Sequence, residues 1–436
     1  MKKKPVNRSK LKERRLAYFL IAPSLVLILA IAIWPVIQSF YFSLFDYQLN
    51  DPRKSSIHMD HSLDLGRYLN SYPFLVSALE NEKEGLDSEG DASIDEIISS
   101  LKKVDGEIRE NYGERYEKID EMLFNFEKPS DDLKMVNLNG ETADELDHTL
   151  NDVAKEVKVL SESAELNQEK KINGLTDNLS ESVVTPNFIG FDHYAKNLTS
   201  SRMWTALFNT SVFTFISVAV ELVLGLAIAI LINKAFFGRG LVRASILVPW
   251  AIPTAVSALM WKFLYDGQNG IVAKYFEDLG LVSQMGDLLT TGAGAMFSVI
   301  FSDIWKTTPY MALLLLAGLQ TIPSSLYEAA SIDGAGKWKQ FVSITLPLLK
   351  SSILVALLFR TLDAFRVFDL IYVLTGGGPA NSTETISILA YKVMFSQTNF
   401  GEGSALAVIV FVCVAIISGI FIKLLGADLI SDDAKR

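Results

Sequence analysis

Cysteine is almost absent from this 436-residue chain, which contains only Cys413. A single cysteine cannot form a disulfide within the chain or build a cysteine-based metal site. A phosphate-binding loop is also lacking, because the glycine run at 376–378 is followed by Pro379 and not by the Lys-Ser or Lys-Thr pair that such a loop needs. We therefore expect no ATPase site, no cofactor and no metal in this chain.

Charge is sparse as well, with 21% charged residues against 50% hydrophobic ones. A transmembrane helix needs about 20 mainly apolar residues to cross a hydrocarbon core roughly 30 Å thick. The sequence has six apolar runs of that length, at 16–45, 206–233, 241–264, 293–319, 344–374 and 404–425. It therefore predicts an all-α integral membrane protein with six transmembrane helices, the first at 16–45 and five more within a core at 191–425.

The distribution of basic residues predicts the orientation of these spans. Residues 1–15 contain eight Lys or Arg and one Glu, and basic segments beside a span tend to stay in the cytoplasm. An even number of spans then places a short tail at 426–436 in the cytoplasm too. We expect the first span to be retained rather than cleaved as a signal peptide, because its apolar run is too long and no small-x-small site follows. This basic cluster adjoins a span, so no nucleic-acid partner is expected.

A strongly acidic segment separates the first two spans. Residues 51–190 contain 32 Asp or Glu and 15 Lys or Arg, a net charge of −17, while the whole chain has a formal net charge of −10. The remaining residues are therefore net basic, which implies two different environments. By the alternation of spans, we expect residues 46–190 to form an extracytoplasmic insert.

The insert carries two apolar patterns with helical spacing. Apolar residues recur at steps of three and four in two series: Ile97, Leu101, Val104 and Ile108, and then Leu146, Leu150, Val153, Val157 and Leu160. Pro129 and the pair Asn139-Gly140 lie between them as turn signals. The patterns predict a coiled-coil-like hairpin of two antiparallel helices. A loosely structured acidic loop is the alternative, because two helices alone bury little core.

A polar, glycine-containing stretch at 320–343 lies between the fourth and fifth spans, on the predicted cytoplasmic side. Ser325 and Glu328 have the spacing of a capping box that would start a short helix, and Gly334 would end it. A second helix at 337–345 would lead into the fifth span near Pro347. The result is a helical elbow whose small residues allow close approach by another protein; an ordinary capped loop is the alternative.

The string EAASIDGAGKWKQFVSITLP, which begins at Glu328, resembles the EAA motif of the membrane subunits of binding-protein-dependent ABC importers. The matching residues are Glu328, Ala329, Ala330, Gly334, Ile344, Leu346 and Pro347. In that family, the elbow inserts into a cleft of the cytoplasmic ATPase and transmits ATP-driven closure to the spans. The resemblance implies this coupling role for Glu328, Ala329, Ala330, Asp333 and Gly334.

Further segments are similar to the carbohydrate branch of these importers, in particular to the larger membrane subunit of maltose and trehalose systems. They include LAYFLIAPSLVLILAIAIWPVIQSFYFSLFDY, WTALFNTSVFTF, LVPWAIP and ALLFRTLDAFRVFDLIYVLTGGGPANSTETIS. The likeness covers nearly all of the chain except residues 51 to about 184, and it departs from the family pattern at Ser351, where a proline is common. It implies a second homologous permease subunit, two ATPase subunits that bind ATP and Mg, and an external solute-binding protein.

The fifth apolar run contains ionisable residues, which are costly inside a membrane and favour a partner or an aqueous path. Arg360, Asp363, Arg366 and Asp369 recur at steps of three, and aromatic residues accompany them. Aromatic faces suit the apolar faces of a sugar ring, and the charged groups suit its hydroxyls. The predicted pathway residues are Arg360, Asp363, Phe365, Arg366, Asp369 and Tyr372. The alternative is that they pair and pack within the core, as Asp303 with Lys306 would, while Glu221 stands alone.

These observations predict a permease subunit that moves a sugar, of the maltose or trehalose class or a related oligosaccharide, across the cytoplasmic membrane by alternating access. Import of a phosphorylated polyol such as glycerol 3-phosphate is an alternative, although it calls for a more basic pathway. A membrane-anchored sensor is a further alternative, which we expect to require a longer cytoplasmic output region than residues 426–436.

Overall fold

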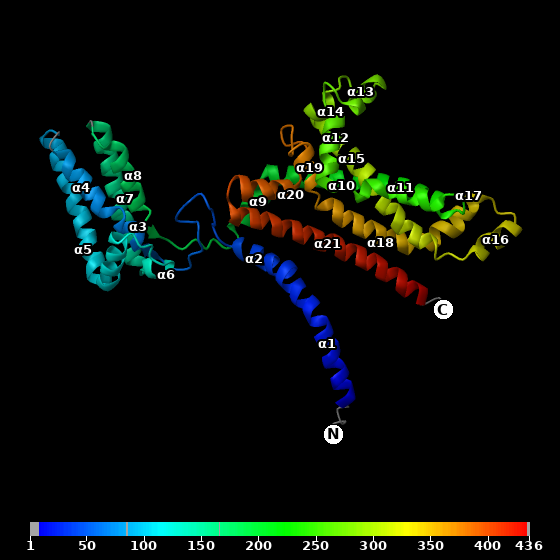
Figure 1. The fold of residues 1–436 in the computed structure, drawn as a ribbon, viewed down its shortest axis with the longest axis horizontal. Helices are drawn as coiled ribbons and strands as arrows, with labels where there is room; N and C mark the ends of the chain where they lie inside the picture. Colours follow the sequence, from blue (N-terminus) through cyan, green and yellow to red (C-terminus); the bar gives the residue numbers. More distant parts are fainter. Residues whose placement is uncertain (1–7, 84–85, 165, 434–436) are drawn as a thin grey trace. The chain divides into compact units, whose positions relative to one another are not determined.

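A computed structural model describes residues 8–83, 86–164 and 166–433, so part of the predicted basic N-terminus and the last three residues of the tail lie outside the described residues. The chain forms two compact units (Figure 1). The membrane unit contains the chain up to Ser43, Phe191–Gln397 and the chain from Glu402 onward. The insert unit contains Leu44–Gly190 together with Thr398–Gly401.

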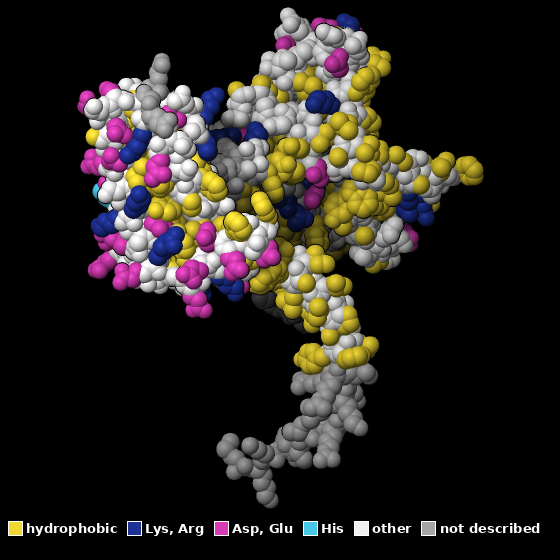
Figure 2. Space-filling model, turned by 60° about the vertical axis from the view of Figure 1, so that its left-hand side comes forward, with side chains coloured by type: hydrophobic (Ala, Val, Ile, Leu, Met, Phe, Trp, Pro, Cys, Tyr) yellow, Lys and Arg dark blue, Asp and Glu magenta, His cyan; other side chains and the backbone are white. Residues whose placement is uncertain are grey.

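Among the residues that the structure describes, four segments of the membrane unit are long and apolar enough to cross a bilayer: Tyr18–Phe42, Ser201–Asn233, Lys337–Phe365 and Phe400–Leu425. Two bent helix pairs pass the same test, which gives up to six spans if each pair is counted as one. Figure 2 shows hydrophobic side chains exposed over these helices, whereas acidic and basic side chains are interspersed over the insert unit. Apolar side chains on the outside of a helix suit lipid or a partner subunit.

The elements of the membrane unit follow in chain order. The N-terminal segment consists of α1 (Arg8–Ile28), the π-helical turn η1 (Leu29–Ile33) and α2 (Trp34–Phe42). After the insert come α9 (Asp192–Thr199), α10 (Ser201–Asn233), α11 (Arg239–Ala251), α12 (Thr254–Leu264), α13 (Ile271–Asp278), α14 (Asp287–Thr290), α15 (Gly292–Leu319) and α16 (Ser324–Ile332). The last elements are α17 (Lys337–Gln340), η3 (Phe341–Thr345), α18 (Leu346–Phe365), α19 (Asp369–Leu374), α20 (Ile386–Tyr391), η4 (Lys392–Ser396) and α21 (Phe400–Asp433).

The third predicted span, 241–264, is not one straight helix. Its two helices, α11 and α12, meet at an angle of 87°. Pro253 stands at the break, and Ile252 before it has the extended conformation, with a ψ of 133°. Proline has no N–H to donate and disfavours a helical conformation in the preceding residue, so the helix ends there.

The fifth predicted span, 344–374, is also interrupted. Helix α18 ends at Phe365, and α19 begins only at Asp369. Asp369 thus lies in the first turn of a new helix, where a carboxylate is favoured by the helix dipole. The predicted charged stripe is therefore divided between two helices and the turn that joins them.

Helices α10, α15 and α18 form the packed centre of the membrane unit, and two glycines permit their close approach. A Cβ atom on Gly225 of α10 would lie 3.1 Å from the backbone nitrogen of Ala312 on α15. One on Gly318 of α15 would lie 2.5 Å from the Cβ of Ser352 on α18. The small residues let the backbones come close enough for polar side chains to meet between the helices.

The insert unit is larger than the predicted hairpin. It contains α3 (Leu65–Leu69), α4 (Tyr72–Glu82), α5 (Ser88–Phe124), α6 (Asp131–Lys134), α7 (Gly140–Ser163) and α8 (Glu169–Ser180). Strands β1 (Ser62–Asp64), β2 (Met135–Asn137) and β3 (Val183–Val184) form an antiparallel sheet in the order β2-β1-β3. The two predicted apolar series lie on α5 and α7 and are buried in one core. The prediction of a simple two-helix insert was wrong, because α4, α8 and the sheet close that core.

Candidate functional site

The elbow lies between α15 and α18 and consists of α16 and of α17 with η3. Its turn follows the end of α16, where Gly334 has a φ of +76°. The N–H of Ala335 donates to the carbonyl of Ala330 at 2.9 Å, and the N–H of Gly334 donates to that of Ser331 at 3.1 Å. A left-handed glycine with such paired bonds is a common helix ending, because glycine has no Cβ to clash.

The predicted capping box is not formed at the start of α16. Pro323 occupies the N-cap position with a ψ of 135°, and no side-chain hydrogen bond caps this described turn. Ser325 lies inside the first turn of the helix, so its side chain is not at the position that a capping box requires. The extended conformation of Pro323 thus marks the helix start instead.

Hydrogen bonds made by the side chains of Tyr327 and Gln340 brace the elbow internally. The hydroxyls of Tyr327 and Thr345 lie 2.9 Å apart and join α16 to η3. The Gln340 amide donates to the Ser331 hydroxyl and to the Ala335 carbonyl, each at 2.9 Å. The two arms of the elbow are therefore held together by side chains that the sequence motif did not identify.

The outer surface of the elbow is exposed. Glu328, Ala329, Asp333 and Gly334 are exposed and Ala330 is half-buried. Beside them, the side chains of Ile332 and Trp338 are 86% and 76% exposed. Charged, small and large apolar residues thus form one exposed end, a composition that suits a protein contact.

A buried ion cluster connects the three central helices of the membrane unit. Arg360 of α18 donates to Glu221 of α10, with Nε to Oε2 at 2.5 Å and Nη2 to Oε1 at 2.9 Å. The same guanidinium also pairs with Asp303 of α15. Thr307 donates its hydroxyl to Glu221 at 2.7 Å. Because Arg360, Glu221 and Asp303 are all buried, these side chains depend on each other for the interactions that water would otherwise supply.

The predicted pairing of these residues was incomplete. Glu221 does not stand alone but is the main partner of Arg360. Lys306 donates to the carbonyl oxygen of Ile252 at 2.7 Å and lies 3.4 Å from that of Trp250. These carbonyls lie at the end of α11, where the helix leaves its last carbonyls without intrahelical partners. A positive charge at that end is also favoured by the helix dipole.

Four of the six predicted pathway residues share one cavity of about 200 Å³. Arg360, Asp363, Arg366 and Asp369 line it, together with Asp303 and Lys306. The other two predicted residues are placed differently: Phe365 is buried, and Tyr372 stacks on Phe368 with ring centres 5.2 Å apart. The cavity therefore combines cations and carboxylates from α15, α18, the turn after α18 and the first turn of α19. Within the described residues, no group of His, Cys, Asp or Glu side chains is arranged to hold a metal ion.

Comparison with known proteins identifies the family. Residues 221–430, which contain both the elbow and the ion cluster, match the family "Binding-protein-dependent transport system inner membrane component". The chain is 46% identical over 236 residues to the trehalose/maltose transport system permease protein MalF of Thermococcus litoralis, a match that covers 54% of this chain and 79% of that protein. The chain belongs to this family. It is a membrane permease subunit of an ABC sugar importer.

Other relatives are named for trehalose alone or for another sugar compound. The permease is 45% identical over 249 residues to the trehalose permease SugA of Mycobacterium tuberculosis, covering 56% of this chain and 78% of that protein. It is 40% identical over 238 residues to the sulfoquinovosyl glycerol permease SmoG of Agrobacterium fabrum, a match that covers 55% of this chain and 77% of that protein. Its fold is similar to that in a crystal structure of a bacterial ABC transporter for alginate import. The match has a TM-score of 0.50 and 24% identity, and it covers 55% of this chain and 84% of the other.

Proposed function

We propose that this permease imports a sugar of the trehalose or maltose class, or a related oligosaccharide, by alternating access. One structural relationship carries the proposal. The elbow directly joins α15 and α18, and these same helices carry Asp303 and Arg360 of the charged cavity. A force applied to the elbow thus acts on the helices that hold the cavity.

The proposed assembly contains a second homologous permease subunit, two ATPase subunits that bind ATP and Mg, and an external solute-binding protein. In this assembly the exposed end of the elbow, with Glu328, Ala329, Ala330, Asp333 and Gly334, docks on an ATPase subunit. The chain crosses the membrane six times, with both termini in the cytoplasm. The insert then lies outside, where we propose that it contacts the binding protein.

The charges of the cavity favour a neutral sugar over a phosphorylated polyol. Three carboxylates, those of Asp303, Asp363 and Asp369, accompany the cations of Lys306, Arg360 and Arg366. A phosphate needs an excess of positive charge, whereas sugar hydroxyls need both donors and acceptors. We therefore propose that Asp363, Arg366 and Asp369 contact the sugar while Arg360 holds the helices around it.

The test is sugar uptake and ATP hydrolysis in vesicles that contain the permease with its co-purified partners. Glu328→Lys is expected to abolish uptake of trehalose and maltose and to release the ATPase subunits. Asp278→Lys, which makes the same charge reversal at an exposed position of α13, is the matched control and is expected to retain uptake. Normal uptake by Glu328→Lys would overturn the coupling role of the elbow.

A deletion that keeps the contacts at the base of the insert tests whether the insert contacts the solute-binding protein. Asn187 joins the two segments that enter and leave the insert, since its side chain accepts from the N–H of His58 at 2.9 Å and donates to the carbonyl of Ser56 at 2.8 Å. Replacing residues 61–184 by a short glycine-serine linker leaves these contacts in place. We expect weaker binding of the solute-binding protein; unchanged affinity and uptake would show that the insert makes no such contact.

A further inference from the structure

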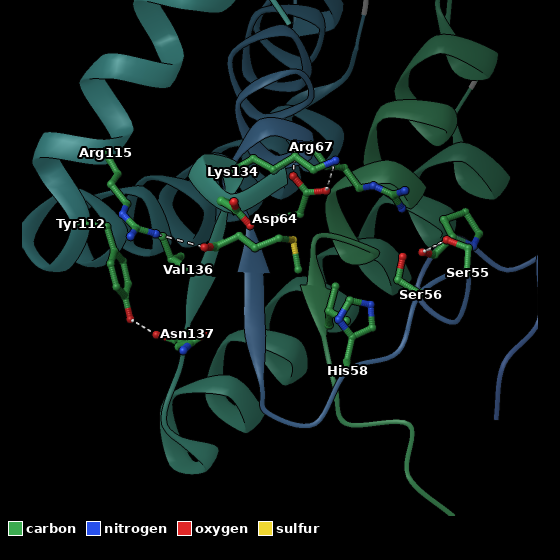
Figure 3. Close-up of a pocket in the computed structure, with 14 residues that line it drawn as sticks. Ser55, Ser56, His58, Asp64, Arg67, Tyr112, Arg115, Lys134, Val136 and Asn137 are labelled. Carbon is green, nitrogen blue, oxygen red and sulfur yellow. Dashed lines mark hydrogen bonds and ion pairs between the residues drawn. The ribbon is translucent and has the colours of Figure 1, made fainter. Parts of the chain in front are cut away.

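The insert unit contains a polar cavity that the transport function described above does not use. The cavity has a volume of about 770 Å³ (Figure 3). Tyr112 and Arg115 of α5 lie on one side of it, and His58 and the neighbouring loop lie on the other, with Asp64 of β1 between them. It is thus assembled from segments that only the folded insert brings together.

Cations from three elements gather in this cavity, although residues 51–190 have a net charge of −17. They are Arg67 of α3, Arg115 of α5 and Lys134 of α6. Arg67 pairs with Glu181 at 2.7 Å, and Lys134 lies 4.0 Å from Asp64. The cavity therefore offers donors and acceptors side by side, without the strong excess of positive charge that an anion would need.

The adjacent sheet edge is closed to another strand. Arg115 donates to the carbonyl of Met135 at 3.1 Å, and the Tyr112 hydroxyl donates to that of Asn137 at 3.0 Å. These carbonyls belong to β2, an outer strand of the sheet, and side chains that occupy them hinder the addition of a further strand. This arrangement favours a small polar ligand over an extended peptide.

His58 extends the neutral part of the lining. Burial lowers the pKa of its imidazole below the ordinary value of 6.5. The ring is therefore neutral at pH 7, with one nitrogen that donates and one that accepts. Both functions match a sugar hydroxyl, which also donates and accepts.

A second cavity, of about 390 Å³, adjoins the first, since Asp64, Arg67 and Lys134 line both. Phe126 lines the second cavity and is 98% exposed. We call the two adjoining cavities the groove; each has an aromatic residue in its lining, Tyr112 in the first and Phe126 in the second. Aromatic faces pack against the apolar faces of pyranose rings, so the groove suits a ligand of more than one ring.

We infer that this groove of the insert binds a neutral oligosaccharide, at a site separate from the charged cavity among the spans. The inference deepens the proposed function, on which it rests for the class of sugar. Its consequence is that the extracytoplasmic insert recognises cargo itself, in addition to any contact with the binding protein.

The test uses the full chain in lipid nanodiscs with a reporter at the groove. Met59→Cys, in a Cys413→Ser background, places a single environment-sensitive fluorophore on an exposed residue next to His58. The probes are maltose, trehalose and maltotriose, with glucose 6-phosphate as the anionic comparison. Saturable responses to the neutral sugars are expected, with maltotriose the tightest.

Arg115→Gln is the main variant, and Lys118→Gln is its matched control, since both remove an exposed cation from α5 and only Arg115 lines the groove. We expect at least a tenfold loss of affinity for Arg115→Gln and none for Lys118→Gln, at equal thermal stability. Phe126→Ser, a variant at an exposed residue, is expected to weaken the binding of maltotriose more than the binding of maltose.

Three results would overturn the inference: no saturable response to any neutral sugar, tighter binding of glucose 6-phosphate, or equal losses for Arg115→Gln and Lys118→Gln. These failures are distinguishable from failure of the proposed function. If the elbow test shows sugar import and the reporter stays silent, only the groove is wrong. If the reporter responds and neither trehalose nor maltose is imported, the proposed cargo is wrong.

Discussion

Arg360 of α18 and Glu221 of α10 form a two-pronged ion pair between residues that are 139 positions apart in the sequence. Both side chains are buried, with 1% and 0% of their surfaces exposed. A planar guanidinium matches the two oxygens of a carboxylate, which makes this pair geometrically specific. It therefore fixes the relative position of two spans around the cavity.

Removing one partner of this pair is expected to destabilise the permease strongly. In Glu221→Ala the Arg360 guanidinium stays buried and keeps Asp303 as its only buried carboxylate partner among the described residues. Breaking a buried ion pair in this way lowers the free energy of unfolding by about 3–5 kcal/mol. The measurement is the thermal unfolding midpoint of the purified chain in detergent. Glu277→Ala is the control, because it breaks a surface pair with Lys274 that is worth at most about 1 kcal/mol. Similar midpoints for both variants would contradict the role of the cluster.

Gly318→Ala is expected to disturb the contact between α15 and α18. The new Cβ would lie 2.5 Å from the Cβ of Ser352, and overpacking of this kind costs about 1–3 kcal/mol. Gly419→Ala adds the same methyl group to α21 at a position with nothing within 4 Å. We expect the first variant to lower the unfolding midpoint and the second to leave it unchanged. If the double variant Gly318→Ala/Ser352→Gly regains the wild-type unfolding midpoint, the clash involves the Ser352 side chain. A wild-type midpoint for Gly318→Ala alone would refute the predicted clash.

Gly334→Ala tests the turn of the elbow. The φ of +76° is unfavourable for a residue with a Cβ by about 1–2 kcal/mol. Gly336 has a φ of −64° and accepts alanine without this strain, so Gly336→Ala is the control. We expect Gly334→Ala to reduce sugar-stimulated ATP hydrolysis several-fold in the assembled importer while Gly336→Ala does not. Equal activities would show that the turn conformation is not required for coupling.

His58 is expected to make the insert less stable in acid. Burial lowers its pKa in the folded insert below the unfolded value near 6.5, so the unfolded chain binds the proton more readily. Its contribution to stability is therefore complete above about pH 6.5 and declines as the pH falls toward the folded pKa. Thermal unfolding followed by the reporter at residue 59 measures this loss. The loss of stability in acid should be smaller in His58→Gln than in the wild type. His148→Gln is the control, because this side chain is 78% exposed, and it should lose as much stability as the wild type. An identical loss in the wild type and in His58→Gln would contradict the role of His58.

The position of the elbow follows from local sequence, but the side chains that support it do not. The glycine at 334 and the second helix from 337 are where the pattern predicts them, because a helix end and its turn depend on neighbouring residues. Tyr327 and Gln340 brace the elbow through contacts with Thr345 and Ala335. Neither residue has a local signature, since each contact depends on how the two arms fold back on each other.

The amino-acid sequence alone predicts which segments are apolar enough to enter a membrane, that an acidic insert follows the first of them, and that a helical elbow lies within residues 320–343. These properties depend on contiguous residues, such as the length of an apolar run or the spacing of a helix. The folded structure is needed to see that Glu221 pairs with Arg360, that Lys306 donates to a carbonyl at the end of α11, and that strands of two or three residues complete the insert. The reason is that a buried charge or a short strand is stable only with a distant partner, and distance along the chain does not predict which partner it finds.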